Sequence, residues 1–357
     1  MLGLNSHGWA ESFVDSITPT YTWGRGISWP AANFNIGGYF DSSYQYKKYN
    51  KFVSKDRTAL TDLSLFISWS PHEQLRFFSE VEVQDVLATE GQKNLEDTLR
   101  AERLYIDYLA NDSITLRLGK FLTPIGRWNV IHAAPLIWTT TRPLVTDKRL
   151  FTDHSVGAML TQKFEISEHN LDVSFFVDDS RDFDVFDTDL ESRLGFENAI
   201  GGRLNFEVSE DLQIGMSYMD YKNNTITNLP RNRLAGIDLL WKKNGYEIQI
   251  ESIYRQSNNE IRVFENNKIR GQDNTEIGLF AQSVIPLTDQ FFVVGRYEYL
   301  EGIHDKTKIE THVGVTGLAW RPFVPLVIKS EYRFTDGIRF NQTVVPTGFF
   351  ASVSMFF

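Results

Sequence analysis

The sequence predicts an all-β fold: a transmembrane, antiparallel, up-and-down β-barrel of about sixteen strands, with a third external loop that folds inward. Three observations predict it. Segments of about ten residues alternate between apolar and polar side chains. The connections between these segments alternate between short and long. One row of each segment also carries many charges, while the other row is apolar.

Alternation with a period of two residues indicates β-strands and recurs from about residue 34 to the end of the chain. The clearest segments are 34–47, 62–70, 74–84, 113–121, 170–179, 199–209, 212–222, 234–242, 246–255, 291–300, 326–336 and 347–357. Weaker segments at 101–109, 155–164, 275–285 and 310–321 fill the remaining places.

The lengths of the connections predict how the strands are joined. Short turns are expected at 70–74, 109–112, 165–170, 209–211, 242–245, 286–290 and 321–325. Longer polar loops are expected at 48–60, 85–99, 121–154, 178–197, 223–232, 256–273, 301–309 and 337–346. Tight turns at one end and long loops at the other are typical of outer-membrane barrels.

The charged row of each strand is expected to face a water-filled lumen. An Arg or Lys exposed to lipid near the middle of a membrane costs roughly 2–4 kcal/mol. A barrel of about sixteen strands is also too wide for side chains to fill. The predicted lumen wall includes Arg76, Glu80, Arg103, Arg117, Arg203, Arg255, Arg296 and Arg333.

A soluble protein made of two β-sandwiches is the alternative fold, since its strands also alternate. It would need connections of mixed length and a pattern that changes between its domains, whereas this pattern is even from 34 to 357. We therefore expect one barrel domain over 34–357, preceded by a periplasmic segment over 1–33. That segment contains Trp9, Trp23 and Trp29, and it could plug the lumen, contact a periplasmic partner or lie at the membrane interface.

Composition argues against several other classes of protein. With 0 Cys, the chain cannot form a disulfide scaffold, a thiolate zinc site or a covalent c-type haem site, and its net charge of −10 argues against nucleic-acid binding. No apolar run reaches the roughly 18 residues of a membrane-spanning helix. The 7 His are scattered without metal-ligand spacing, so we expect no metal, no cofactor and no catalytic residues. No signal-peptide pattern is visible at the N-terminus, and we expect a mature chain.

Two motifs resemble those of known outer-membrane proteins. The last strand, TGFFASVSMFF, ends on Phe357 and resembles the C-terminal signal that the barrel-assembly machinery reads. The stretch LRLGKFLTPIGRWN (116–129) resembles the Gly-(Lys/Gln)-Phe-x-x-Pro-(Phe/Ile)-Gly segment of the phosphate-selective porin O/P superfamily. This resemblance implies a bacterial, commonly trimeric barrel of sixteen strands whose third external loop enters the lumen. The inward rows alternate acid with base and so depart from the superfamily's arginine ladder and lysine cluster.

The loop at 121–154 is predicted to form the pore constriction. It is unusually apolar for a loop, and it can bury these residues only against the inner wall or a neighbouring subunit. Its charged residues, with one at its base, are Lys120, Arg127, Arg142, Lys148, Arg149, Asp147 and Asp153. These cations either attract anions or pin the loop to acidic residues of the wall, and both roles are compatible.

The predicted function is an outer-membrane porin for passive diffusion of small hydrophilic solutes or ions, with a weak anion bias. Its expected partners are outer-membrane lipid, lipopolysaccharide, the barrel-assembly machinery and two further copies of itself. The acidic stretch 178–191 could bind Ca²⁺ or bridge to lipopolysaccharide, although a solvated acidic surface is the simpler interpretation. The alternative function is a barrel scaffold that sheathes a periplasmic redox protein or lipoprotein, and an enzyme is less well supported than either.

Overall fold

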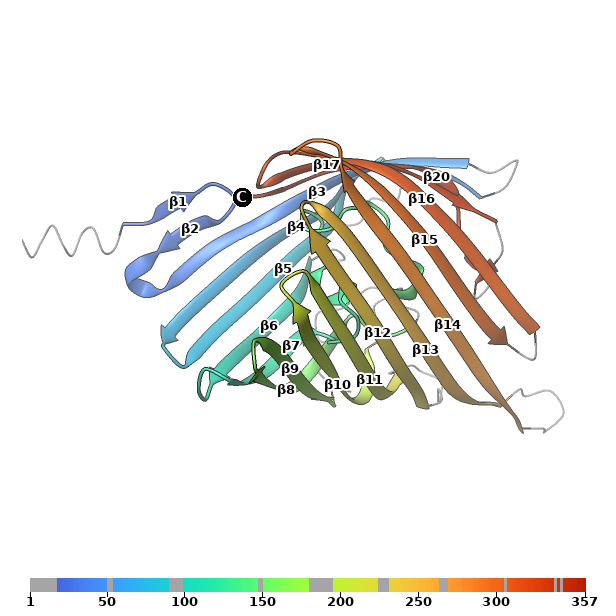
Figure 1. The fold of residues 1–357 in the computed structure, drawn as a ribbon, viewed down its shortest axis with the longest axis horizontal. Helices are drawn as coiled ribbons and strands as arrows, with labels where there is room; N and C mark the ends of the chain where they lie inside the picture. The colour runs from blue at the N-terminus through green and yellow to red at the C-terminus, as the bar shows by residue number, and fades with distance from the viewer. Residues whose placement is uncertain are drawn as a thin grey trace, which may run out of the picture.

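The computed structural model describes residues 18–49, 54–89, 99–146, 150–179, 195–223, 231–262, 269–304, 307–336, 339–340 and 343–357. These residues form an 18-stranded antiparallel sheet, in which two strands make an N-terminal hairpin and the other sixteen close into a barrel (Figure 1). The barrel strands are β3 (Phe34–Lys48), β4 (Ser54–His72), β5 (Leu75–Ala88), β6 (Leu99–Leu109), β7 (Ile114–Leu122), β8 (His154–Ile166), β9 (His169–Asp178), β10 (Phe196–Ser209), β11 (Leu212–Asn223), β12 (Arg231–Lys243), β13 (Tyr246–Arg262), β14 (Ile269–Pro286), β15 (Phe291–His304), β16 (Thr307–Phe323), β17 (Leu326–Thr335) and β20 (Thr347–Phe356). The predicted all-β, antiparallel barrel of about sixteen strands is confirmed, and the two-sandwich alternative is wrong because one sheet contains every barrel strand.

The barrel closes where the last strand meets the first. Strand β20 pairs with β17 on one side and with β3 on the other. The backbone N–H of Phe357 donates to the carbonyl of Gly38 at 2.9 Å, and the N–H of Gly38 donates back at 3.1 Å. A Cβ at Gly38 would lie 2.1 Å from the carbonyl oxygen of Ser64, so only glycine fits there.

The connections follow the predicted alternation, but several strands are longer than predicted. All the predicted short turns are present, and long connections separate β7 from β8 and β9 from β10. The loop predicted over 48–60 is wrong, because β4 already begins at Ser54 and pairs Lys55 with Lys47. Strand β13 likewise extends to Arg262 and β14 begins at Ile269, so both strands enter the loop predicted over 256–273. Backbone hydrogen bonds to the neighbouring strand continue there although the apolar alternation has ended.

Each barrel strand has one apolar face and one polar face. On β15, Phe291 and Tyr297 are 44% and 48% exposed, whereas Arg296 and Glu298 on the other face are 3% and 1% exposed. Other strands repeat this pattern, with Leu65 exposed on β4 and Glu251 buried on β13. We call these the apolar face and the polar face of the barrel. Exposed apolar rows around the whole barrel are the reverse of a soluble surface, where large apolar patches are rare.

An N-terminal hairpin precedes the barrel, formed by β1 (Thr20–Thr22) and β2 (Gly26–Trp29) and followed by a short 3-10 helix, η1 (Pro30–Ala32). Strand β2 pairs with the start of β3, where Trp29 lies opposite Phe34. Trp23 packs against Phe323, the last residue of β16 before the turn to β17, with ring centroids 6.2 Å apart. The hairpin therefore lies at the short-turn end of the barrel, and Trp9 lies outside the described residues.

Two further features complete the described chain. Strands β18 (Arg339–Phe340) and β19 (Thr343–Val344) form a separate two-stranded sheet between β17 and β20. Among the residues that the structure describes, no helix has the length and apolar content needed to cross a membrane.

Candidate pore constriction

The connection from β7 to β8 is the longest part of the described chain without strands, and we call its residues 123–146 and 150–153 the constriction segment, after the role predicted for it. It contains one short helix, α3 (Trp128–Ile131), and one 3-10 turn, η2 (Leu144–Thr146). Gly126 has a φ of 65°, and a Cβ there would lie 2.4 Å from Oε2 of Glu251. The glycine thus provides both the left-handed turn and the close approach to the wall.

Carboxylates on the polar face hold the backbone of this segment at three places. Glu251 of β13 accepts hydrogen bonds from the backbone N–H groups of Arg127 (3.1 Å) and Trp128 (2.6 Å). A short helix leaves its first N–H groups without partners, and a carboxylate at that end also interacts favourably with the helix dipole. The wall residue therefore caps α3 from outside the segment.

Two more glutamates repeat this arrangement further along the segment. Glu331 of β17 accepts from the N–H groups of Thr140 (2.8 Å) and Thr141 (2.9 Å). Glu298 of β15 accepts from the N–H of Leu144 at 2.6 Å. Because these bonds involve ionised acceptors, each is stronger than a neutral one.

Cations of the polar face bind the carbonyl groups of the segment. Arg296 donates to the carbonyl of Thr141 at 2.9 Å and to its hydroxyl at 2.8 Å. Lys329, only 2% exposed, donates through Nζ to the carbonyl of Ala134 at 2.8 Å. Wall and segment therefore satisfy each other's buried polar groups, as burial requires.

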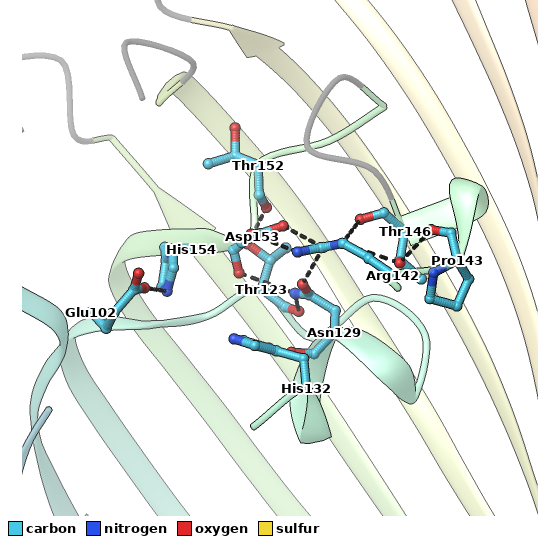
Figure 2. A network of polar contacts seen from close by, with 10 residues as sticks. All are labelled: Glu102, Thr123, Asn129, His132, Arg142, Pro143, Thr146, Thr152, Asp153 and His154. Carbon is cyan, nitrogen blue, oxygen red and sulfur yellow. Dashed lines mark hydrogen bonds and ion pairs between the residues drawn. The ribbon is translucent and has the colours of Figure 1, made fainter. Parts of the chain in front are cut away.

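Arg142 connects the two ends of the segment (Figure 2). Its guanidinium group binds both oxygens of Asp153, at 2.6 and 3.0 Å, and Nε donates to the carbonyl of Thr146 at 2.5 Å. It also stacks over Trp128, 4.7 Å from the ring centroid. Sequence reasoning expected any pinning partner on the barrel wall, whereas Asp153 belongs to the segment itself. These contacts favour pinning over anion attraction for Arg142.

His132 lies beside this network. Its Nδ1 is 2.7 Å from the carbonyl oxygen of Asn129, and its ring stacks on Trp128 with centroids 5.7 Å apart. Burial lowers the pKa of His132 to about 4, and the positive charge of Arg142 acts in the same direction. The imidazole is therefore neutral near pH 7.

An apolar cluster packs between the segment and the barrel strands. Segment side chains including Trp128, Leu144, Val145 and Phe151 pack in one buried cluster with residues of the strands. The strand members include Phe176, Phe196, Met219, Leu234, Phe280 and Leu300, which continue the polar rows toward the long-loop ends. Sequence reasoning missed this apolar patch. The signal was present, since the row of Arg296 and Glu298 next reaches Leu300.

The arginines predicted for the wall are in the polar rows, and most are paired with acids. Arg103 binds Glu80 (2.5 Å), Arg117 binds Asp107 (2.7 Å), and Arg203 binds Asp238 (2.6 Å). The remaining arginine contacts are Arg76 opposite Asp107 in register, Arg255 with Glu276, Arg296 with Glu298, and Arg333 with the carbonyl of Pro346. Arg127, on the segment, bonds Gln213 and lies 3.9 Å from Asp238.

Some predicted residues lie elsewhere or outside the described chain. Lys120 is directly opposite Leu104 in register and has the same parity as the exposed Leu118, so it belongs to the apolar face and not to the constriction. Period-two alternation gives the reason: Lys120 is three residues from Arg117 and must point the other way. Asp147, Lys148, Arg149 and most of the acidic stretch, 180–191, lie outside the described residues. Within the described chain, no group of three or more His, Asp or Glu has a metal-binding arrangement.

The chain is similar in fold to several bacterial outer-membrane proteins. Similar structures include the loop L8 deletion mutant of the outer membrane protein OmpT of Vibrio cholerae (TM-score 0.63, 9% identity, 92% of this chain and 100% of that chain). Two others are an anion-selective porin from Comamonas acidovorans (TM-score 0.62, 11%, 91% and 100%) and the outer membrane channel DcaP of Acinetobacter baumannii (TM-score 0.62, 10%, 91% and 97%). OmpT is also known in a trimer form (TM-score 0.57, 9%, 91% and 99%).

The chain also resembles one known protein in sequence, at low identity. An uncharacterized protein of Aquifex aeolicus (strain VF5) is 21% identical over 333 residues, which cover 84% of this chain and 74% of that protein. No model of a protein family matches the chain. The resemblance to the phosphate-selective porin O/P superfamily therefore stays a prediction.

Proposed function

We propose that the protein is a porin of the bacterial outer membrane, which forms a water-filled channel for passive diffusion of small hydrophilic solutes or ions. One observation carries the proposal: the constriction segment is bound to the polar face of the barrel by Glu251, Glu298 and Glu331, while the opposite face is exposed and apolar. In a closed barrel of sixteen strands, the polar face then lines the lumen and the segment narrows it.

The apolar face suits lipid. Its exposed residues surround the barrel, and aromatic pairs such as Phe291 stacked on Trp320 lie beside the short turns. We infer that the short turns and the segment 1–33 are periplasmic, and that lipopolysaccharide contacts the opposite end. The pairing of Phe357 with Gly38 supports a role for the terminal aromatic residue in closing the barrel, in addition to its resemblance to an assembly signal.

The channel mechanism follows from the wall. Charged groups on the polar face replace part of the hydration shell of a passing solute. Since most arginines there are paired with acids, as in Arg203 with Asp238, we propose a weak anion bias and not a strong anion filter. The names of the similar porin and channel structures, and the trimer form of OmpT, support a channel over an enzyme and a homotrimer over a monomer.

Conductance in planar bilayers tests this proposal. The purified chain should give discrete open steps in KCl, and replacing residues 133–140 by a short Gly-Ser linker should increase the step size because it removes part of the constriction. Lys243→Gln is the control and should leave the step size unchanged. Lys243 is exposed beside a short turn, and its side chain binds Asp211. If the wild-type chain gave no steps, a plugged sheath around a partner would replace the porin proposal.

A further inference from the structure

A cavity of about 300 Å³ lies between the first part of the constriction segment and the polar faces of β6 to β11. Arg103, Arg117, Arg127 and Arg203 all line it. Asp172 is the one carboxylate among the described lining residues. A cavity of this size is at the lower end of the range for small-molecule sites.

The arginines are held in fixed orientations around the cavity. The guanidinium of Arg117 lies 3.7 Å from the ring centroid of Tyr105, and that of Arg103 lies 4.7 Å from that of Phe78. Stacking and the acid partners fix these planes in advance, so a ligand would not have to order them.

These acid partners do not occupy all the donors. Arg103 binds Glu80 through Nε, and Arg117 binds Asp107 through Nε and Nη2. Among the described residues, nothing accepts a hydrogen bond from the two Nη groups of Arg103 or from Nη1 of Arg117. Nε of Arg127 is buried and has no hydrogen-bond partner in the described chain, and the carboxylate of Asp238 lies 3.9 Å from it. Unused guanidinium donors in a cavity suit an anionic oxygen ligand.

Part of the lining of the same cavity is apolar. Leu122, Pro124, Val130, Ile131 and Met159 line it. Val130 and Ile131 are 44% and 40% exposed, although neighbouring Trp128 is buried. The segment therefore presents uncovered aliphatic surface to the same cavity that the arginines line.

We propose that this cavity is a binding subsite for an amphipathic organic anion: a carboxylate with a compact apolar body, which lies against Val130 and Ile131 while the carboxylate faces Arg103 and Arg127. The subsite rests on the proposed porin function and gives the channel a preferred class of solute. A small inorganic anion would leave the aliphatic wall uncovered. A neutral apolar solute would leave the guanidinium donors unused. Neither of these two solutes would therefore use both the arginines and the aliphatic side chains of the cavity.

Channel block by benzoate tests the proposal on the full-length chain. We expect benzoate to reduce the open-channel current in KCl at concentrations at least ten times lower than acetate or inorganic phosphate, and benzyl alcohol to have no such effect. Arg103→Gln should weaken the benzoate block about tenfold. Ile131→Ser should weaken it severalfold and leave the effect of acetate unchanged. Arg231→Gln, whose exposed side chain binds Asp220 outside the cavity, is the matched control.

Equal block by benzoate and acetate would overturn the proposal, because the aliphatic wall would then contribute nothing. Stronger block by phosphate would overturn it in favour of an inorganic-anion site. If the wild-type chain did not conduct, the porin function would fail instead. Benzoate binding by calorimetry on the detergent-solubilised chain, with Ile131→Ser and Arg231→Gln compared, would still decide the subsite.

Discussion

Glu331→Gln should loosen the middle of the constriction segment and leave the barrel intact. The two oxygens of Glu331 accept from the N–H groups of Thr140 and Thr141, at 2.8 and 2.9 Å. The amide keeps one acceptor oxygen and turns an NH₂ donor toward the other N–H, so at least one charge-assisted bond is lost. Such a bond is worth about 1.5–3 kcal/mol, which changes the ratio of detached to attached states roughly 10- to 150-fold.

Open-channel noise in single-channel recordings measures this change. A segment that detaches locally should add current fluctuations at unchanged barrel stability, with stability followed by the heat-induced mobility shift on gels. Glu207→Gln is the matched control, since Glu207 lies on the wall but bonds Asn170 and Gln213 instead of the segment. Unchanged noise in Glu331→Gln, or an equal increase in the control, would refute the idea that wall carboxylates hold the segment.

Three further predictions concern the segment and the closure of the barrel. Arg142→Gln removes the two bonds to buried Asp153, and breaking such a buried pair costs about 3–5 kcal/mol. The variant should increase current noise without shifting the reversal potential. A large shift of the reversal potential would instead indicate an anion-attracting role. Burial lowers the pKa of His132 to about 4, so the folded segment resists protonation of this imidazole. The segment is therefore fully stable above pH about 6.5 and loses up to about 3 kcal/mol of stability as the pH falls to 4. Current noise should rise over that range, and less so in His132→Gln. Deleting Phe357 removes its hydrogen bonds with Gly38 and should lower the yield of heat-modifiable barrel; an unchanged yield would contradict a role in closure.

The wall of the barrel could largely be predicted from local pattern. Alternation along 62–70 and 291–300 already assigned Leu65 to one face and Glu298 to the other, because side chains on a strand alternate with a fixed period. The same rule assigns Lys120 to the apolar face, because its parity is opposite to that of Arg117. The predicted strand ends were wrong for a different reason. Ser54 to Leu60 has no apolar row to reveal it and is a strand because it pairs with its neighbour.

The site was less predictable than the wall. The apolar content of residues 121–154 predicted that this stretch buries side chains, since Trp128 and Leu144 are unusual in a polar loop. It did not reveal that Glu251, Glu298 and Glu331 accept their hydrogen bonds from the segment, because each glutamate lies more than 100 positions from the residues that it binds. Nor did it indicate that Arg142 would bind Asp153.

The sequence alone thus determined the number and polarity of the strands, because alternation and turn length are local properties that each stretch of chain carries by itself. Only the tertiary structure decided which charges are paired, where the segment is attached, and that four arginines and several aliphatic side chains line one cavity. Those features depend on distances between strands that are neighbours around the barrel or face each other across it, and such distances exist only once the sheet has closed.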